Sequence, residues 1–234
     1  MVGMSLEEEI KSRLDVVQEQ IEKACRRSQR SKDSITLIGV SKKQSLEKMF
    51  LVQQLGVTHF GENYVQELTE KKSEFQDSSV HWHFIGGLQR NKCKFLVGEV
   101  DLIHSVDRLP LAQEIHRLCE DSQKRQSILI QVNQGEEISK SGAHADNIKE
   151  LAENIMGLPT LNLLGLMSIP PPAKNEKEAK FYFSELRSLA EAILIPMGIS
   201  NPDLSMGMSH DFMWAIEEGA TMIRVGTGIF GSRA

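Results

Sequence analysis

Two segments near opposite ends of the chain carry residue types suited to covalent and anion-binding chemistry. Lys42 follows the apolar run 35–40, and a lysine delivered by a buried strand is a candidate nucleophile toward an aldehyde. Near the end of the chain, Arg224 precedes Gly226-Thr227-Gly228, where backbone N–H groups and a hydroxyl could cradle a phosphate. Together they predict a site for pyridoxal 5′-phosphate (PLP), an aldehyde that carries a phosphate.

More than one lysine could react with an aldehyde. A surface lysine just past a strand is the commoner situation, and Lys43 stands directly beside Lys42. Side-chain alternation along a strand favours one of the two facing inward and Lys43 facing the helices. Lys140, after the fifth expected strand, is the second candidate. An inward lysine would be partly desolvated, which favours the neutral amine that attacks aldehydes.

Arg224 lies inside an apolar run, 221–225, where a guanidinium needs a partner. Alternation places Met222, Arg224 and Gly226 on one strand face. A surface arginine is the simpler interpretation. An arginine facing the pyridine nitrogen of PLP would keep that nitrogen unprotonated, because a cation disfavours a second positive charge beside it. Such a site would hold PLP but leave its ring a weak electron sink.

Ser209 and two histidines carry weaker signals. Ser209 precedes the expected helix 211–218, and it either caps that helix or donates to a phosphate. His81 and His83 share one strand face, so both imidazoles could reach a metal ion. No third ligand stands at a matching spacing, which favours packing or ligand contact instead. We therefore predict no metal site.

The composition is that of a globular protein of one domain. The chain has 234 residues, a formal net charge of −5 and 40% hydrophobic residues, and we expect one domain over residues 1–234. Mild acidity argues against nucleic-acid binding, and no apolar stretch is long enough to cross a membrane. Three cysteines far apart in the sequence suit a reducing compartment, so we expect a cytoplasmic location.

Apolar, β-branched runs alternate with segments of helical spacing along the chain. The expected strands are 35–40, 58–60, 81–85, 102–104, 127–132, 161–166, 203–206 and 221–225. The expected helices are 45–55, 63–75, 88–97, 107–121, 146–156, 176–195 and 211–218. A further helix, opened by a capping box of Ser5 and Glu8, ends near Arg27.

Strict alternation requires parallel strands, because each strand must be followed by a crossover. Eight such units in about 230 residues match an α/β (β/α)8 TIM barrel with an extra N-terminal helix. A doubly wound open sheet is the alternative. In a barrel the carboxyl ends of the strands form the active site, and Lys42, Ser209, Gly226 and Thr227 all follow such ends, while Arg224 lies within the last expected strand.

Six segments spread over essentially the whole chain resemble one known family. They are 40–42 (VSK), 60–67 (FGENYVQE), 82–92 (WHFIGGLQRNK), 165–167 (GLM), 204–209 (LSMGMS) and 224–231 (RVGTGIFG). The combination resembles the PLP homeostasis protein family. That resemblance implies a barrel similar to the N-terminal domain of alanine racemase.

The resemblance also implies a role for each matching residue. Lys42 would be the Schiff-base lysine, Asn63 would lie beside the ring, and Arg224 would face the pyridine nitrogen. The phosphate would be held by Ser209, Gly226 and Thr227. The chain departs from the family at two places: Lys43-Gln-Ser45 stands where Thr-Lys-Pro is common, and His210 where Ser is common. Both departures could shift PLP affinity or access.

The family implies a PLP carrier without a dedicated reaction, which would buffer PLP or deliver it to PLP-dependent apo-enzymes. Racemisation needs an acid/base group on each face of the α-carbon. Alanine racemase takes a tyrosine from an extra β domain, for which the expected barrel leaves no room, and this chain's tyrosines are Tyr64 and Tyr182. A weak racemase and a scaffold with structural PLP remain as alternatives. We expect a monomer.

Overall fold

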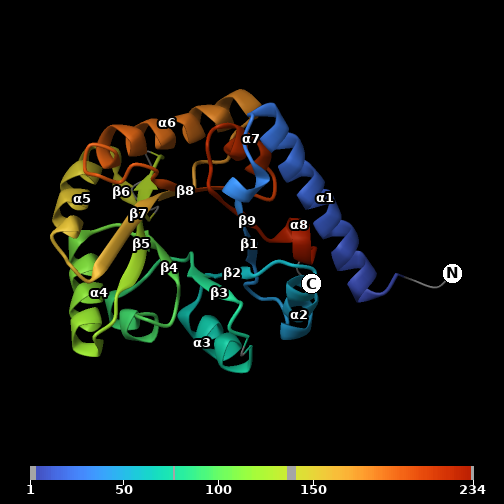
Figure 1. The fold of residues 1–234 in the computed structure, drawn as a ribbon, viewed down its shortest axis with the longest axis horizontal. Helices are drawn as coiled ribbons and strands as arrows, with labels where there is room; N and C mark the ends of the chain where they lie inside the picture. Colours follow the sequence, from blue (N-terminus) through green and yellow to red (C-terminus); the bar gives the residue numbers. More distant parts are fainter. Residues whose placement is uncertain (1–3, 76, 136–140, 233–234) are drawn as a thin grey trace.

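A computed structural model describes residues 4–75, 77–135 and 141–232, and eight of its strands close into a parallel barrel (Figure 1). Their order around the barrel is β4-β3-β2-β1-β9-β8-β7-β5, and a β4–β5 pairing closes the circle. The strands are β1 (Thr36–Val40), β2 (His59–Glu62), β3 (His81–Phe84), β4 (Leu102–Val106), β5 (Gln126–Asn133), β7 (Leu161–Ser168), β8 (Asp203–Met208) and β9 (Met222–Val225). Closure confirms the predicted barrel and excludes the open sheet.

Helices surround the barrel and connect successive strands (Figure 1). They are α1 (Leu6–Arg27), α2 (Leu46–Gln54), α3 (Val65–Glu74), α4 (Leu109–Ser122), α5 (Ile148–Met156), α6 (Glu176–Leu194), α7 (Phe212–Glu217) and α8 (Thr227–Phe230). Short 3-10 helices are η1 (Lys32–Ser34), η2 (Arg90–Phe95) and η3 (Ala145–Asn147).

The N-terminal helix α1 begins where the sequence predicts. Ser5 accepts a hydrogen bond from the Glu8 backbone at 3.2 Å, and the Glu8 carboxylate accepts one from the Ser5 backbone at 2.8 Å. This reciprocal cap satisfies two backbone donors that a helix start leaves without partners. The helix buries one apolar face, which includes Leu14 and Val17, and it contacts α2, α7 and α8.

The period of two along each strand separates an inner core from an outer core. The inner cluster fills the barrel and consists of Ile38, Leu102, Leu129, Met167 and Met222. The outer cluster lies between the barrel and its helices and contains the alternate strand residues. Inward positions above the inner cluster are polar, and these positions build the site described below.

Several elements differ from the prediction. The short helix α8 (Thr227–Phe230) was not predicted. The segment 88–97 is not an α-helix, because only Arg90–Phe95 are helical and they adopt the tighter 3-10 form. The strand β6 (Ala143–His144) was not predicted; its two residues pair with the end of β5 outside the closed barrel. Among the described residues, no helix has both the length and the apolar character needed to cross a membrane.

Candidate cofactor site

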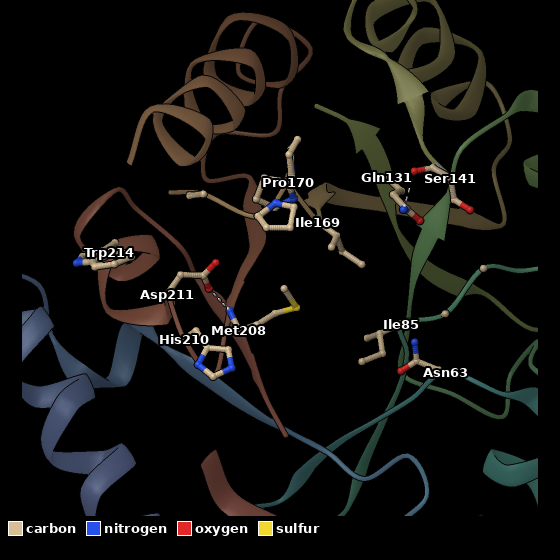
Figure 2. A pocket seen from close by; sticks show the side chains of 15 residues that line it. Asn63, Ile85, Gln131, Ser141, Ile169, Pro170, Met208, His210, Asp211 and Trp214 are labelled. Atoms are coloured by element: carbon tan, nitrogen blue, oxygen red, sulfur yellow. Dashed lines mark hydrogen bonds between the residues drawn. The ribbon is translucent and has the colours of Figure 1, made fainter. Parts of the chain in front are cut away.

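A cavity of about 760 Å³ opens over the carboxyl ends of the strands, where a barrel places its active site (Figure 2). Its walls come from β5 and from the segments after β2, β3, β5, β7 and β8. The lining residues are Asn63, Ile85, Gly86, Gly87, Gln131, Ser141, Ile169, Pro170, Pro171, Pro172, Ala173, Met208, His210, Asp211 and Trp214. Ile169 and the three prolines are apolar, whereas Asn63, Gln131, His210 and Asp211 contribute polar groups to the lining.

Asn63 is the predicted site residue that lines this cavity directly. Its Oδ1 atom is buried and has no hydrogen-bond partner among the described residues. Gly86 fixes the backbone there: a Cβ on Gly86 would lie 2.1 Å from the Asn63 carbonyl oxygen, so only glycine allows this approach. An unpartnered amide oxygen on a residue that lines a cavity is suited to a ligand donor.

Lys42 follows β1 within a turn rather than on the strand itself. It is half-buried, whereas Lys43 is exposed and adopts a positive φ of 59°. The Lys43 backbone N–H donates to the Glu67 carboxylate on α3. The predicted contrast between the two lysines therefore holds in exposure, but it arises from a turn and not from strand alternation. Lys140 lies outside the described residues.

A buried ionic network supports the residue next to Lys42. The Ser41 hydroxyl donates to Glu62 Oε1 at 2.7 Å, and Lys71 Nζ donates to the same oxygen at 2.7 Å. Lys71 Nζ also donates to the Ser41 carbonyl at 2.6 Å and to Glu67 at 2.7 Å. Glu62 is fully buried, and that burial raises the pKa of its carboxyl, with Lys71 opposing the rise.

Arg224 is buried on the inner face of β9 with only 3% of its surface exposed. Its Nη1 donates to Ser205 Oγ at 2.7 Å and its Nη2 donates to the Ser168 carbonyl at 2.8 Å. Burial lowers the pKa of the guanidinium to about 10, and Asp211 opposes this shift. Arg224 therefore stays cationic at neutral pH, and its five N–H donors exceed these two contacts.

The loop after β9 presents backbone N–H groups to Ser209. Gly226 N donates to Ser209 Oγ at 3.2 Å, and Gly228 N donates to the same oxygen at 3.3 Å. Ser209 therefore does not cap α7, whose N-cap is Asp211, and the capping interpretation is wrong. Thr227 is exposed at the start of α8. One oxygen already occupies the two N–H donors that an anion would use.

The backbone between β8 and α7 brings Ser209 to that loop. Gly207 adopts a positive φ of 86°, and a Cβ there would lie 2.5 Å from the Ala215 side chain, so glycine is required for the turn. Asp211 then accepts a hydrogen bond from the Met208 backbone at 2.6 Å. This turn places Ser209 against the β9 loop and Asp211 in the cavity wall, as Figure 2 shows for Asp211.

Strand pairing brings the predicted residues to one end of the barrel. Ile38 of β1 pairs with Arg224 of β9, and Val40 pairs with Gly61 of β2. A Cβ on Gly226 would lie 3.5 Å from the Val40 carbonyl, two residues before Lys42. Asn63 lines the cavity, while the other five predicted residues follow or lie on the adjoining strands β1, β8 and β9.

Several residues of the site had no role assigned from sequence. Glu62 and Lys71 support the Lys42 turn, while Ser205 and Asp211 act on Arg224. Glu62 offered one signal, because it is an acidic residue just after the expected strand 58–60, where a barrel places its active site. The helix residue Lys71 offered none, because its contacts depend on how α3 lies against the barrel.

The histidines bind one another rather than converging on one point. His81 Nδ1 lies 3.1 Å from Asp101 Oδ1, and His83 has ring contacts to His59 and His104. Among the described residues, no three His, Cys, Asp or Glu side chains are grouped so that they could hold a metal ion.

Sequence comparison settles the family. Over residues 13–234 the chain matches the family described as "Alanine racemase, N-terminal domain". The Pyridoxal phosphate homeostasis protein of Aquifex aeolicus is 45% identical over 94% of this chain and 97% of the relative. The chain belongs to the pyridoxal phosphate homeostasis protein family. The Escherichia coli K12 member is 38% identical over 96% of this chain and 97% of its own.

Solved structures agree with this membership. PipY of Synechococcus elongatus PCC7942, solved with PLP bound, has a TM-score of 0.81 and 33% identity, covering 92% of this chain and 100% of PipY. A protein of Bifidobacterium adolescentis described as unknown has a TM-score of 0.91 and 31% identity, covering 98% of both chains. Alanine racemase of Clostridium difficile 630 shares the fold alone, with 15% identity, a TM-score of 0.74 and coverage of 96% of this chain and 56% of the racemase.

Proposed function

We propose that this chain binds PLP at the carboxyl end of its barrel and serves in PLP homeostasis, with residues 1–234 acting as one domain. The observation that carries the proposal is the contact between the β9 loop and β1. Gly226 and Gly228 N–H groups converge on one oxygen, and Gly226 lies against Val40, two residues before Lys42. An anion site and a lysine are thereby adjacent, as a phosphorylated aldehyde requires.

Lys42 is proposed as the residue that binds PLP covalently. Its amine would condense with the aldehyde to a Schiff base, one water leaving for each imine formed. PLP supplies a conjugated ring that can stabilise a carbanion next to that imine. The relatives named for PLP homeostasis and the PLP-bound PipY structure support this choice of ligand.

The residues present fit a phosphorylated pyridine. Arg224 can only donate hydrogen bonds, so it suits an unprotonated ring nitrogen. Asn63 Oδ1 and the Ser168 hydroxyl are buried at this end of the barrel without described partners, as expected where a ligand or water completes the polar contacts. We propose that the phosphate takes the donors of Gly226 and Gly228, with Ser209 and Thr227 beside it.

Titration with PLP tests the proposal directly. Wild-type protein should gain a visible imine absorbance, and borohydride reduction followed by peptide mass spectrometry should place the pyridoxyl group on Lys42. Lys42→Ala should lose both signals while staying folded, because a lysine in a turn supplies little core packing. Lys43→Ala is the matched control and should keep both. A pyridoxyl group on Lys43 or Lys140 would refute the assignment.

We further propose that the bound PLP has no dedicated reaction here, because Arg224 disfavours protonation of the ring nitrogen and so weakens the electron sink. Arg224→Glu should retain PLP more weakly but raise α-proton exchange per bound cofactor. Proton NMR of an amino-acid panel in deuterated water measures this exchange. An unchanged absorption spectrum together with unchanged exchange would contradict the placement of Arg224 at the ring.

A weak amino-acid racemase is the second candidate, favoured by the barrel shared with alanine racemase. The same exchange experiment on wild-type protein separates the two functions. Exchange sustained at the rate of an enzyme would overturn the carrier hypothesis.

We propose PLP-dependent apo-enzymes as recipients, a monomeric carrier and a cytoplasmic location. The three cysteines, Cys25, Cys93 and Cys119, are buried as free thiols, which suits a reducing compartment. Mixing the PLP-loaded protein with an apo-transaminase tests delivery. Recovery of transaminase activity faster than free PLP at the same concentration allows would support direct transfer.

A further inference from the structure

Three histidines and a serine form a continuous chain of contacts inside the barrel, starting at Arg224. Arg224 Nη1 lies 2.7 Å from Ser205 Oγ, and Ser205 Oγ lies 2.9 Å from His104 Nδ1. His104 Nε2 then lies 2.9 Å from His83 Nδ1, and His83 Nε2 lies 2.9 Å from His59 Nδ1. Every link is within hydrogen-bond distance.

The chain crosses the barrel and joins its two ends. His59, His83 and His104 lie on the neighbouring strands β2, β3 and β4, whereas Ser205 lies on β8, which does not pair with any of these strands. His59 is half-buried and borders a cavity of about 240 Å³ beside the starts of β1 and β2, the end opposite the cofactor site.

A barrel interior does not need histidines to be filled. The inner cluster of Ile38, Leu102, Leu129, Met167 and Met222 fills the same barrel with apolar side chains. His104 is fully buried and His83 is 4% exposed, and a buried polar group is unfavourable unless it is hydrogen-bonded. The rings meet through single nitrogen pairs, and no metal-binding group was found among the described residues. Their hydrogen bonds are therefore the feature to explain.

The chemistry of Arg224 sets the direction of these hydrogen bonds. A guanidinium only donates, so Ser205 Oγ accepts from it and has its own proton to give. His104 Nδ1 is the described neighbour that can accept that proton, which leaves the His104 proton on Nε2. The same reasoning passes along the chain: His83 accepts at Nδ1 and donates from Nε2 to His59.

We propose that Ser205, His104, His83 and His59 are positioning residues for Arg224, acting as a hydrogen-bonded relay with one donor direction. Each neutral ring accepts at Nδ1, and His104 and His83 donate from Nε2 to the next ring, so the relay holds the Ser205 oxygen toward the guanidinium. The Ser168 carbonyl holds the other arm. The placement of Arg224 at the PLP ring rests on the proposed function. The hydrogen bonds of the relay do not depend on it.

The surroundings keep the relay neutral. Burial lowers the pKa of His83 to about 3 and lowers the pKa of His104 well below its ordinary value. The pKa of His59 is also lowered, first by burial and then by His81, while Asp101 opposes the shift. Arg224 adds a positive charge next to His104. All three rings are thus uncharged at neutral pH, as a chain of one direction requires.

Nitrogen-15 NMR of histidine-labelled, unliganded wild-type protein tests the relay without any variant. At neutral pH, long-range proton–nitrogen correlations should show His59, His83 and His104 as neutral rings protonated on Nε2. Single histidine variants assign the signals. A proton on Nδ1, or a charged ring, at His83 or His104 would overturn the proposal.

Ser205→Ala then tests the effect on Arg224. Without the hydroxyl, His104 should lose its fixed tautomer, and the dissociation constant for PLP should rise by about 3- to 10-fold, the value of one hydrogen bond. Ser205→Thr keeps the hydroxyl and should restore both. Ser105→Ala is the matched control, because the Ser105 hydroxyl is buried on β4 without a described partner. Equal effects of Ser205→Ala and Ser105→Ala would contradict positioning.

The two readouts separate this inference from the proposed function. If the wild-type protein shows the expected tautomers but does not bind PLP, the proposed function fails and the relay stands. If PLP binds and the tautomers are mixed in wild-type protein, the relay fails and the proposed function stands.

Discussion

Lys42 and Arg224, the residues proposed to hold PLP, each adjoin a buried polar network, and the two networks differ in where they place charge. Behind the Lys42 turn, Lys71 meets two carboxylates and a carbonyl within 2.7 Å. Behind Arg224, the guanidinium meets a hydroxyl and a carbonyl, and no carboxylate contacts it directly among the described residues. The Lys71 network pairs opposite charges. In the Arg224 network one positive charge is surrounded by neutral hydrogen-bonding groups.

The difference follows from position. Lys71 lies on α3 outside the barrel, where Glu62 and Glu67 can reach it from the wall and the helix. Arg224 lies inside, where the proposed ligand supplies the acceptor. A carboxylate on that guanidinium would neutralise the charge that disfavours a protonated ring nitrogen. We infer that the Lys71 network sets the shape of the Lys42 turn. The Arg224 network instead determines how strongly the ring nitrogen of bound PLP resists protonation.

The largest expected effect is on stability, from breaking the paired network. Lys71→Met leaves Glu62 as a buried carboxylate without its counter-ion, which should lower the free energy of unfolding by about 3–5 kcal/mol. The loss should shrink near pH 5, because the raised pKa of Glu62 lets it take up a proton. Urea unfolding at both pH values measures this.

Lys72→Met is the control for that variant. Lys72 is the next residue of α3, and its ion pair with Glu99 lies at 2.9 Å with both side chains partly exposed. Exposed pairs contribute about 1 kcal/mol or less. The loss of unfolding free energy should therefore be several-fold larger for Lys71→Met than for Lys72→Met. Similar losses for both variants would show that the Lys71 network is not stabilised as a buried pair.

The network behind Arg224, which includes His83, should affect how the free energy of unfolding depends on pH. The pKa of His83 is about 3 in the fold, against an ordinary value of 6.5. Below pH 6.5 the His83 ring is therefore protonated in the unfolded chain but stays neutral in the folded protein. The free energy of unfolding falls as the pH falls toward 3. The slope is about 1.4 kcal/mol per pH unit for this one ring.

Chemical unfolding between pH 7 and pH 4.5 measures that slope. His83→Leu should reduce the slope by about 1.4 kcal/mol per pH unit, because one of the buried neutral rings is removed while His104 and His59 remain. His144→Gln is the control: this side chain is 69% exposed and its removal should leave the slope as in wild-type protein. A slope unaffected by His83→Leu would contradict a neutral buried ring.

A smaller effect is expected from Ser41→Ala. The variant removes the hydroxyl donor to Glu62 but leaves Lys71 in place. Losing one hydrogen bond to a charged group should lower the free energy of unfolding by about 2 kcal/mol. Thermal and urea unfolding compare it with Ser105→Ala, whose hydroxyl has no described partner. If Ser105→Ala costs as much, the hydroxyl contact contributes nothing specific.

Much of the fold could be predicted because its signals are local. The apolar runs that became β1 and β9, and the capping box of α1, depend on residues close in sequence. The segment 88–97 misled because its apolar spacing suits an α-helix, while the chain there forms only the short 3-10 helix Arg90–Phe95. The strand β6 has two residues, which is too short to show an alternation of apolar and polar side chains.

Candidate site residues could be proposed from the sequence where backbone motifs mark them, whereas residues linked only by three-dimensional contacts were missed. The glycines after β9 and the lysine after β1 stand out in the sequence. The pairing of Ser41 with Lys71 spans 30 residues, and that of His104 with Ser205 spans 101 residues. No sequence period marks such contacts, because they depend on strand order around a closed barrel. His81 and His83 were noted as a pair, yet His83 belongs with His59 and His104.

A crystal structure of the protein soaked with PLP tests the central claim most directly. We expect continuous electron density from Lys42 Nζ to the cofactor, the ring nitrogen facing Arg224, and the phosphate on the N–H groups of Gly226 and Gly228 in place of the Ser209 hydroxyl. Density joining PLP to another lysine, or a ring nitrogen turned away from Arg224, would contradict the proposed site.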